Sequence, residues 1–297
     1  MKNFFNEQYF GEEGYMNLLN NILKYGIETQ DRTGIGCKKL INQQLIFDFD
    51  DGFPSASVRP APLRFAFEEF WMFLKGITDT KYLEEKNINI WKGNTSKEFL
   101  QKRGIGYEPE GSMGKAYGYQ FRNFNGEKVD QLYDVVNNLR NDPFSRRHYV
   151  TFWNPAQSNE MALTPCFHSH QFIVLPSEDT YRPNLSLKVF SRSSDVLFGL
   201  PFNYQQYGLY LMAIANLCDM NPDMLMVDLT DSHIYNNQIE YVHEVLTREY
   251  YDGESEVGIN KNLNSINNLL SLTWEDISDN RVVNKTPMNT SKPNMAI

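Results

Sequence analysis

The sequence predicts a single α/β domain, residues 1–297, built around a β-sheet with helices packed on it. The chain is 41% apolar, including 14% aromatic residues, which is enough to build a substantial core at this length. Segments with helical spacing alternate with segments of strand alternation, and no linker or internal repeat divides them. We therefore expect one domain rather than two.

The first half of the chain has two expected helices and one expected strand. Residues 12–25 have apolar side chains at helical spacing and end before Gly26. After the loop "QDRTGIG", the stretch "KKLINQQLIFDF" alternates as a strand does. Residues 63–74, "LRFAFEEFWMFL", form a helix that is apolar nearly all round, so we expect it to be buried.

The second half begins with a polar, glycine-bearing surface excursion over residues 92–116 and a helix over residues 128–140. Three strands are then expected, at "HYVTFW", "FHSHQFIV" and "LSLKVFSR". A long apolar helix is expected over residues 203–218. Residues 260–280 are rich in asparagine and ambiguous.

The net charge of −9 argues against a general nucleic-acid binder, because neutralising phosphates requires an excess of Lys and Arg. Any anionic ligand must instead be held by a local cationic cluster. The three cysteines are too few and too scattered for a disulfide framework. No apolar run approaches the length of a membrane span, and no secretion signal is evident, so we expect a cytoplasmic protein.

The stretch "TPCFHSHQFIV" places Cys166 between a proline and a strand. Cys166 could be a nucleophile, a metal ligand or a small buried hydrophobe. Strand alternation divides the following side chains between two faces: His168, His170 and Phe172 on one, and Phe167, Ser169, Gln171 and Ile173 on the other. We interpret the histidines as polar strand residues rather than metal ligands, because no third ligand lies at a telling distance.

A nucleophilic cysteine needs a nearby positive charge to favour the thiolate. Arginines recur in similar polar contexts: Arg32, Arg146, Arg147 and Arg192. Each could be an ordinary surface charge. Together, and with Ser193, they indicate a pocket for a phosphate dianion bound by bidentate guanidinium groups.

Two further pairs suggest a site. Glu68 and Glu69 lie on the apolar helix, where a glutamate is either an edge residue whose carboxylate reaches solvent or a buried acid with a raised pKa suited to proton transfer. Neighbours on a helix point about 100° apart, so at most one of them faces a given cleft. His233 and Tyr235 are two apart, which puts both on one face of a strand, where they could bind a sugar hydroxyl.

These segments together resemble the thymidylate synthase family, in order along nearly the whole chain. The resemblance rests on eight pieces: "DRTGIG", "EEFWMFLKGITDTKYLEEKNINIW", "AYGYQFRNF", "SRRHYVTFWNP", "MALTPCFHSHQF", "SRSSDVLFGLPFNYQQY", "DSHIYNNQIE" and the terminal "MAI". It implies a large mixed β-sheet flanked by helices, and a dimer packed through the sheet.

The resemblance implies that Cys166 adds to C6 of a pyrimidine nucleotide, so that C5 attacks the methylene of 5,10-methylenetetrahydrofolate. Arg192 would bind the phosphate and favour the thiolate, and Arg32 and Ser193 would complete the phosphate site. No metal is implied.

By the same resemblance, Arg146 and Arg147 would reach across a homodimer interface into the partner's phosphate site. His233, Tyr235 and Gln171 would contact the nucleotide.

The base would be handled by three residues. Glu69, rather than Glu68, resembles the family's relay acid near O4, and Tyr117 the residue that helps to remove the C5 proton. Asn203 would bind the N3–H and O4 edge of uracil, since an amide both donates and accepts. Cytidylate-acting relatives have Asp there, so Asn203 favours dUMP.

The folate would be held by Trp91, Asp195, Arg59 and the terminal Ile297. The sequence departs from the family pattern at Phe167 (His expected), Asn94 (Trp expected) and Ser191 (Gln expected), and "VLFG" transposes the usual order of Leu and Phe.

These departures raise an alternative, a dUMP hydroxymethylase in which water quenches the methylene intermediate. The terminal "KPNMAI" and the retained Trp91 favour the synthase, in which that segment excludes solvent. A non-catalytic nucleotide-binding or RNA-binding relative is a remoter alternative, and the intact Cys166 and Glu69 count against it. A zinc hydrolase has only Cys166, His168 and His170 to offer.

Overall fold

The structure, a computed structural model, describes residues 8–31, 34–178, 180–251, 255–285 and 292. Within these residues the main sheet has eight strands, in the order β1-β3-β8-β6-β5-β4, with β2 beside β3 and β7 beside β8. Its strands are β1 (Gln8–Phe10), β2 (Ile27–Thr29), β3 (Cys37–Asp48), β4 (Tyr149–Thr151), β5 (Phe167–Leu175), β6 (Asn184–Ser191), β7 (Ser194–Asp195) and β8 (Asn221–Tyr235). A separate hairpin pairs β9 (Glu256–Ile259) with β10 (Ile277–Asn280).

The main sheet is mixed. β8 pairs antiparallel with β3 and parallel with β6, while β5 is antiparallel to both β4 and β6. This confirms the predicted α/β fold with a large mixed sheet flanked by helices.

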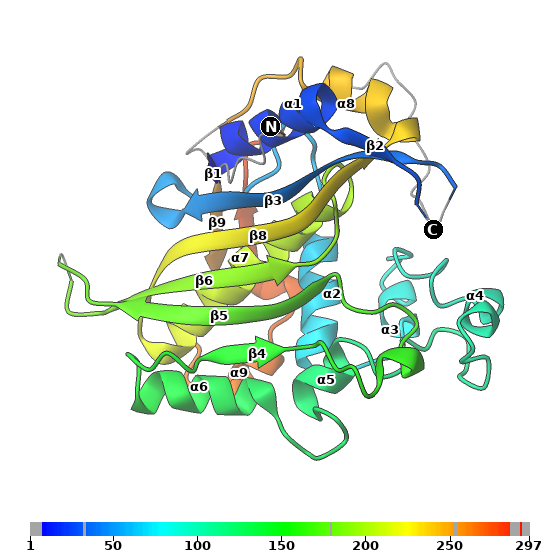
Figure 1. The fold of residues 1–297 in the computed structure, drawn as a ribbon. Coiled ribbons are helices and arrows are strands. Elements are labelled where there is room, and N and C mark those ends of the chain that lie inside the picture. Colours follow the sequence, from blue (N-terminus) through cyan, green and yellow to red (C-terminus); the bar gives the residue numbers. More distant parts are fainter. Residues whose placement is uncertain (1–7, 32–33, 179, 252–254, 286–291, 293–297) are drawn as a thin grey trace.

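The helices are α1 (Gly11–Tyr25), α2 (Leu63–Leu74), α3 (Lys81–Glu84), α4 (Lys97–Lys102), α5 (Gly118–Arg122), α6 (Gln131–Asn141), α7 (Gly199–Cys218), α8 (Ile239–Val245) and α9 (Ile266–Leu270). Short 3-10 turns lie at Phe49–Asp51, Ser158–Glu160, Asn236–Gln238 and Trp274–Asp276. α7 runs behind the sheet and α2 packs beside it (Figure 1). None of the described helices is long and apolar enough to cross a membrane.

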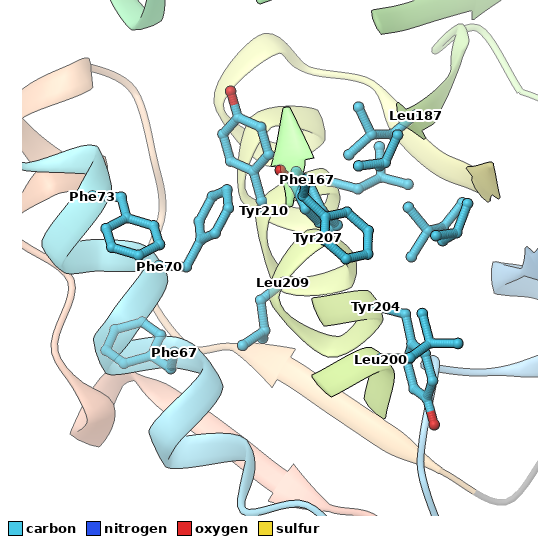
Figure 2. Packing of buried hydrophobic residues seen from close by; sticks show 14 of the residues in the cluster. Phe67, Phe70, Phe73, Phe167, Leu187, Leu200, Tyr204, Tyr207, Leu209 and Tyr210 are labelled. Carbon is cyan, nitrogen blue, oxygen red and sulfur yellow. The ribbon is translucent and has the colours of Figure 1, made fainter. Parts of the chain in front are cut away.

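The core lies between α2, α7 and the sheet. Phe67, Phe70 and Phe73 of α2 point toward α7, whose Tyr207 and Tyr210 lie between them and the sheet (Figure 2). The Phe70 ring contacts the Tyr210 ring with centroids 5.0 Å apart. Burial of this aromatic layer fixes α2 against α7, and both helices then supply side chains to one cavity.

The opposite face of the sheet is not covered by a described helix (Figure 1). Along β6, Leu187 and Val189 are buried, whereas Lys188 between them and Phe190 after them are partly exposed. Lys188 pairs with Asp228 of β8, with Nζ and Oδ2 2.9 Å apart. The two faces of the sheet therefore differ sharply in polarity.

The predicted alternation along β5 is wrong at its first residues. The register shifts between Phe167 and Ser169, as in a β-bulge, where one extra residue turns the side chains that precede it. Phe167 consequently packs against Tyr207 on the same face as His170, and His168 stacks against Phe190 on the other face. Beyond the bulge, His170 and Phe172 share the buried face as predicted.

Other predicted elements differ mainly in extent. The helix predicted over residues 203–218 begins four residues earlier, at Gly199. The strand β8 is the longest in the chain as described, and only its "SHIY" end was predicted. Residues 260–280 include the short helix α9 and the whole of β10.

Candidate active site

A cavity of about 240 Å³ opens where α2, α7 and the start of β5 meet. Five residues proposed from the sequence line it: Glu69, Trp91, Tyr117, Cys166 and Asn203. Most of the other lining side chains are aromatic or aliphatic, including Phe73, Phe198 and Phe202. A thiol, a carboxyl group and an amide thus face one mostly apolar space, the usual character of a small-molecule site.

Arg192 lies beside the Cys166 thiol, with Nη2 3.8 Å from Sγ. Its guanidinium group is held by backbone oxygens, because Nε donates to Pro165 O and Nη2 to Thr164 O, both at 3.0 Å. The backbone N–H of Arg192 also donates to Cys166 O at 3.0 Å. Arg192 does not itself line the cavity. No described carboxylate pairs with it, so its charge is available to an anion that binds beside Cys166.

The residues expected to complete an anion site are only partly gathered around Arg192. Ser193 follows it directly and is partly exposed. The Trp153 ring lies under the Arg192 guanidinium group, 5.8 Å from its centroid. Arg32 lies outside the described residues, as does Ile297.

Tyr117 contacts both the backbone of Cys166, just before β5, and the aromatic core. Its hydroxyl accepts a hydrogen bond from the backbone N–H of Cys166 at 3.0 Å, and its ring stacks on Phe73 with centroids 4.7 Å apart. Burial, and then the nearby Cys166, raises the pKa of Tyr117 well above its usual value. Its φ of +32° is unusual for a residue with a side chain, and such strain is often found at functional sites.

Glu69 is a buried carboxyl group surrounded by neutral donors. The Trp91 indole donates to Oε1 at 2.5 Å, and the Gln206 amide donates to Oε2. Burial raises the pKa of Glu69 to about 7, and these two hydrogen bonds oppose that shift. Glu69 can therefore exchange a proton near neutral pH, as a general acid or base must.

Glu68 has a different environment although it is the next residue of α2. Its carboxylate forms an ion pair with Lys86, whose Nζ also donates to the Tyr82 hydroxyl at 3.1 Å. Glu68 does not line the cavity. The expectation that only one of the two glutamates faces the cleft agrees with this geometry, and that residue is Glu69.

Asn203 lies at the cavity on the first turns of α7. Its Nδ2 donates to Gln206 Oε1 at 3.2 Å. Gln206 contacts both Asn203 and Glu69 and was not among the site residues predicted from the sequence. The available signal was its position three residues after Asn203 on a predicted helix, which puts both side chains on one face.

Asp195 and Arg59 contact Phe198, which lines the cavity, but neither of them lines it. Asp195 Oδ1 accepts from the backbone N–H groups of Leu197 and Phe198 at 3.1 and 2.9 Å, and Oδ2 accepts from Gln238 at 2.9 Å. The Arg59 guanidinium group lies over the Phe198 ring, 4.8 Å from its centroid. Asp195 thus has a structural role in the turn into α7.

His233 and Tyr235 share one face of β8, with ring centroids 5.1 Å apart. His233 Nδ1 lies 3.0 Å from Asp231 Oδ1, and the backbone of His233 pairs with that of Asp195 across β7. The two side chains therefore lie near the Arg192–Asp195 segment, although neither lines the cavity.

Arg146, Arg147 and Gln171 are not brought to Cys166 within this chain. Gln171 Nε2 donates to the backbone oxygen of Arg146 at 3.2 Å. Gln171 is five residues beyond Cys166, about 16 Å of extended strand at ~3.3 Å per residue. Both arginine side chains are exposed, so the charges are available to another molecule rather than to their own cavity.

The histidines of β5 do not converge with the thiol on a metal. His170 is buried among aromatic rings, and the bulge turns His168 to the opposite face. Among the described residues, no group of three His, Cys, Asp or Glu side chains could hold a metal ion.

Comparison with known proteins identifies the family. The family model described as thymidylate synthase matches residues 13–297. This chain belongs to the thymidylate synthase family. It is 36% identical to the thymidylate synthase of Agaricus bisporus over 80% of this chain and 85% of that protein.

The chain is also similar to longer members of the thymidylate synthase family. It is 35% identical to the bifunctional dihydrofolate reductase-thymidylate synthase of Zea mays, over 80% of this chain and 46% of that protein. The Leishmania major protein of the same name is 36% identical over 80% and 47%. The chain spans about half the length of these bifunctional relatives.

Three of the four departures from the thymidylate synthase pattern reach the cavity, at Asn94, Phe167 and Phe198 of "VLFG". Phe167 packs its ring against Tyr207, with centroids 5.6 Å apart. Asn94 has a buried Oδ1 with no hydrogen-bond partner among the described residues. The fourth departure, Ser191, donates to the backbone oxygen of Ser193 at 3.2 Å.

Proposed function

We propose that this protein transfers a one-carbon unit from 5,10-methylenetetrahydrofolate to C5 of dUMP, by reductive methylation to dTMP. The observation that carries the proposal is that Cys166 and Glu69 line one cavity, with the Arg192 cation beside the Cys166 thiol, in a member of the thymidylate synthase family. The folate, when bound, supplies the methylene carbon and the hydride.

The first step belongs to Cys166. The Arg192 guanidinium group, 3.8 Å from Sγ, stabilises a thiolate, which forms a bond to C6 of the base. The electron pair displaced from the C5–C6 bond moves to O4, where Glu69 supplies the proton. With a pKa of about 7, Glu69 is able both to give this proton and to take it back.

Asn203 and Tyr117 act on the same base. Asn203 binds the N3–H and O4 edge of uracil, and the Tyr117 hydroxyl assists removal of the C5 proton. Tyr117 is held in place by the Cys166 N–H and by stacking on Phe73, so thiol and hydroxyl keep a fixed separation.

The cavity residues fit a flat folate ring. Trp91, Phe198 and Phe202 offer apolar faces. Asn94 Oδ1, which has no hydrogen-bond partner in the part of the chain that the structure describes, offers an acceptor to a ring N–H. Arg59, 6% exposed and stacked over Phe198, adds positive charge on this side. Lys292 Nζ lies 5.3 Å from the Phe198 ring centroid, which puts a second cation beside this ring.

We also propose a homodimer packed through the uncovered face of the sheet, in which Arg146 and Arg147 complete the partner's phosphate site. Their exposure and their separation from their own Cys166 support contribution to another subunit. A cytoplasmic location, expected from the cysteine content, remains a prediction.

A dUMP hydroxymethylase is the second candidate. It is favoured by Asn94 and Phe167, since an amide in place of an indole makes the cavity wall more polar and could hold a water beside the intermediate. The two reactions share every step up to the methylene intermediate and differ in whether hydride or water quenches it.

The test is mass spectrometry of the nucleotide product after incubation with dUMP and methylenetetrahydrofolate, with dihydrofolate absorbance followed in parallel. We expect a methyl product and an equal amount of dihydrofolate. A hydroxymethyl product with tetrahydrofolate would establish the second candidate, and no modified nucleotide would reject both.

Two cysteine variants control this test. Cys166→Ser should lower turnover by roughly 10⁴-fold or more, because a hydroxyl is a far weaker nucleophile than a thiolate. Cys218→Ser is the matched change at a thiol outside the cavity, where burial raises the pKa to about 11. It should leave turnover unchanged.

A further inference from the structure

Three side chains form a continuous hydrogen-bonded line along one wall of the cavity. Gln206 Nε2 donates to Glu69 Oε2, and Asn203 Nδ2 donates to Gln206 Oε1 at 3.2 Å. Gln206 is 3% exposed and lies one turn after Asn203 on α7. The line therefore runs from the relay carboxyl group on α2 to the amide that faces the base.

The direction of every hydrogen bond in this line follows from its first member. An ionised carboxylate can only accept, so Gln206 must turn its N–H₂ group toward Glu69. The carbonyl oxygen of Gln206 then faces Asn203, whose N–H₂ group must donate the hydrogen bond to it. Asn203 is left with Oδ1 and the second N–H of Nδ2.

The remaining acceptor and donor of Asn203 complement the edge of uracil but not the edge of cytosine. Uracil presents an N3–H donor beside an O4 acceptor, whereas cytosine presents an N3 acceptor beside an amino donor. A rotated Asn203 amide would match cytosine equally well. Nothing in an isolated asparagine side chain favours one rotation over the other, so the choice depends on its neighbours.

We propose that Gln206 is a specificity-determining positioning residue, which fixes the rotation of the Asn203 amide and so selects uracil over cytosine. This inference rests on the proposed function. Gln206 acts through Asn203 rather than by touching the base. A site built to hydrogen-bond one edge rejects the mismatched edge strongly, because buried polar groups are then left unpaired.

The adjacent Gln205 provides a comparison within the same helix. It is also fully buried, but its Nε2 donates to Pro201 O at 2.7 Å and its Oε1 accepts from Arg281. These partners lie away from the cavity lining. Gln205 thus stabilises the packing of α7, and its removal provides a matched structural control.

The experiment measures the dissociation constants of dUMP and dCMP by calorimetry at pH 8.5, where Glu69 is ionised. The wild type should prefer dUMP. Gln206→Met keeps the volume but neither donates nor accepts, and should shrink this preference by about tenfold or more, because Asn203 becomes free to rotate. Gln205→Met should lower stability and leave the preference as in the wild type.

A rescue variant separates hydrogen bonding from shape. Gln206→Glu keeps an oxygen facing Asn203, with a proton shared between the two carboxyl groups, and should retain the dUMP preference to within about threefold. If Gln206→Met does not fold, Gln206→Leu takes its place.

Failure of the role proposed for Gln206 and failure of the proposed function give different results. A dUMP preference that survives in Gln206→Met or Gln206→Leu overturns the role of Gln206. A wild-type protein that binds neither nucleotide, and yields no product in the mass-spectrometric test, overturns the proposed function itself.

Discussion

The two sides of the cavity differ in the kind of charged group that they hold. On the helical side, the Glu69 carboxyl group accepts hydrogen bonds from two neutral donors, the Trp91 indole and the Gln206 amide. On the thiol side, Arg192 is permanently charged and is held by backbone oxygens beside Cys166. The first arrangement lets a proton come and go near pH 7, and the second keeps a positive charge fixed for an anion. The difference matches the two tasks that the proposed reaction requires.

The largest effect is expected from Glu69→Gln, which tests whether proton exchange at Glu69 distinguishes the helical side of the cavity. An amide cannot supply the proton to O4, so we expect kcat to fall by about 10²- to 10⁴-fold. Glu69 loses its proton as the pH rises through about 7, so the wild-type kcat should decline above that pH, and the variant should lack this limb. The measurement is kcat from pH 6 to 9.

Glu68→Gln is the matched control for that prediction. It makes the same chemical change one residue away, where the carboxylate pairs with Lys86 and does not line the cavity. A wild-type pH profile is expected. Loss of the pH 7 limb in Glu68→Gln, or its retention in Glu69→Gln, would refute the assignment of Glu69.

A smaller effect is expected from Arg192→Lys on the thiol side. Lysine keeps the charge but lacks the planar group that contacts Thr164 and Pro165 together, so it cannot present a bidentate edge to phosphate. The dUMP affinity should fall by about 10- to 100-fold, while that of deoxyuridine, which has no phosphate, should be nearly unchanged. Calorimetry with both ligands checks this.

Arg103→Lys controls for the loss of an arginine held by carbonyl groups. Arg103 donates to the backbone oxygens of Met161 and Ala162 at 3.2 and 3.1 Å and does not line the cavity. Its substitution should affect neither ligand. Equal losses for dUMP and deoxyuridine in Arg192→Lys would contradict a phosphate role.

The smallest effect on activity is expected one layer behind the cavity, at His170. It is fully buried, and neither ring nitrogen has a hydrogen-bond partner among the described residues. Burial lowers its pKa from 6.5 to about 3. The stability it contributes is complete above pH 6.5 and is lost as the pH falls from 6.5 toward 3, by about 2 kcal/mol at pH 5.

His170→Phe should therefore remove this acid sensitivity. Urea unfolding at pH 7.5 and pH 5 should show a loss about 2 kcal/mol smaller in the variant than in the wild type. His243→Phe, at an exposed position, is the control and should leave the difference unchanged. An undiminished loss in His170→Phe would mean that other groups cause it.

The sequence predicted those parts of the fold that periodicity determines alone. The helix over residues 63–74 is observed with the same bounds, because its apolar run is closed by Pro62 and Lys75–Gly76. Two features escaped prediction. The bulge after Phe167 depends on pairing with β6, and β8 is buried on one face but carries Asp223, Asp228 and Asp231, which obscure its alternation.

In the candidate site, too, local sequence predicted some features and long-range contacts determined others. Motifs identified the residues that would touch the nucleotide, and the structure brings Cys166, Glu69, Tyr117 and Asn203 to one cavity. The contacts between them were not predictable, because the meeting of Gln206 with Glu69 joins residues 137 positions apart. Long-range hydrogen bonds depend on how α2 packs against α7, which no local pattern records.

The line from Glu69 through Gln206 to Asn203 also constrains how this protein can change over generations. Asn203→Asp, the exchange that would suit a cytosine edge, would place a carboxylate oxygen against Gln206 Oε1, which has no hydrogen to offer. A lineage moving toward cytidylate would have to alter residue 206 before or together with residue 203. The order of substitutions is therefore restricted. Asn203→Asp alone is disfavoured because it leaves two hydrogen-bond acceptors facing each other.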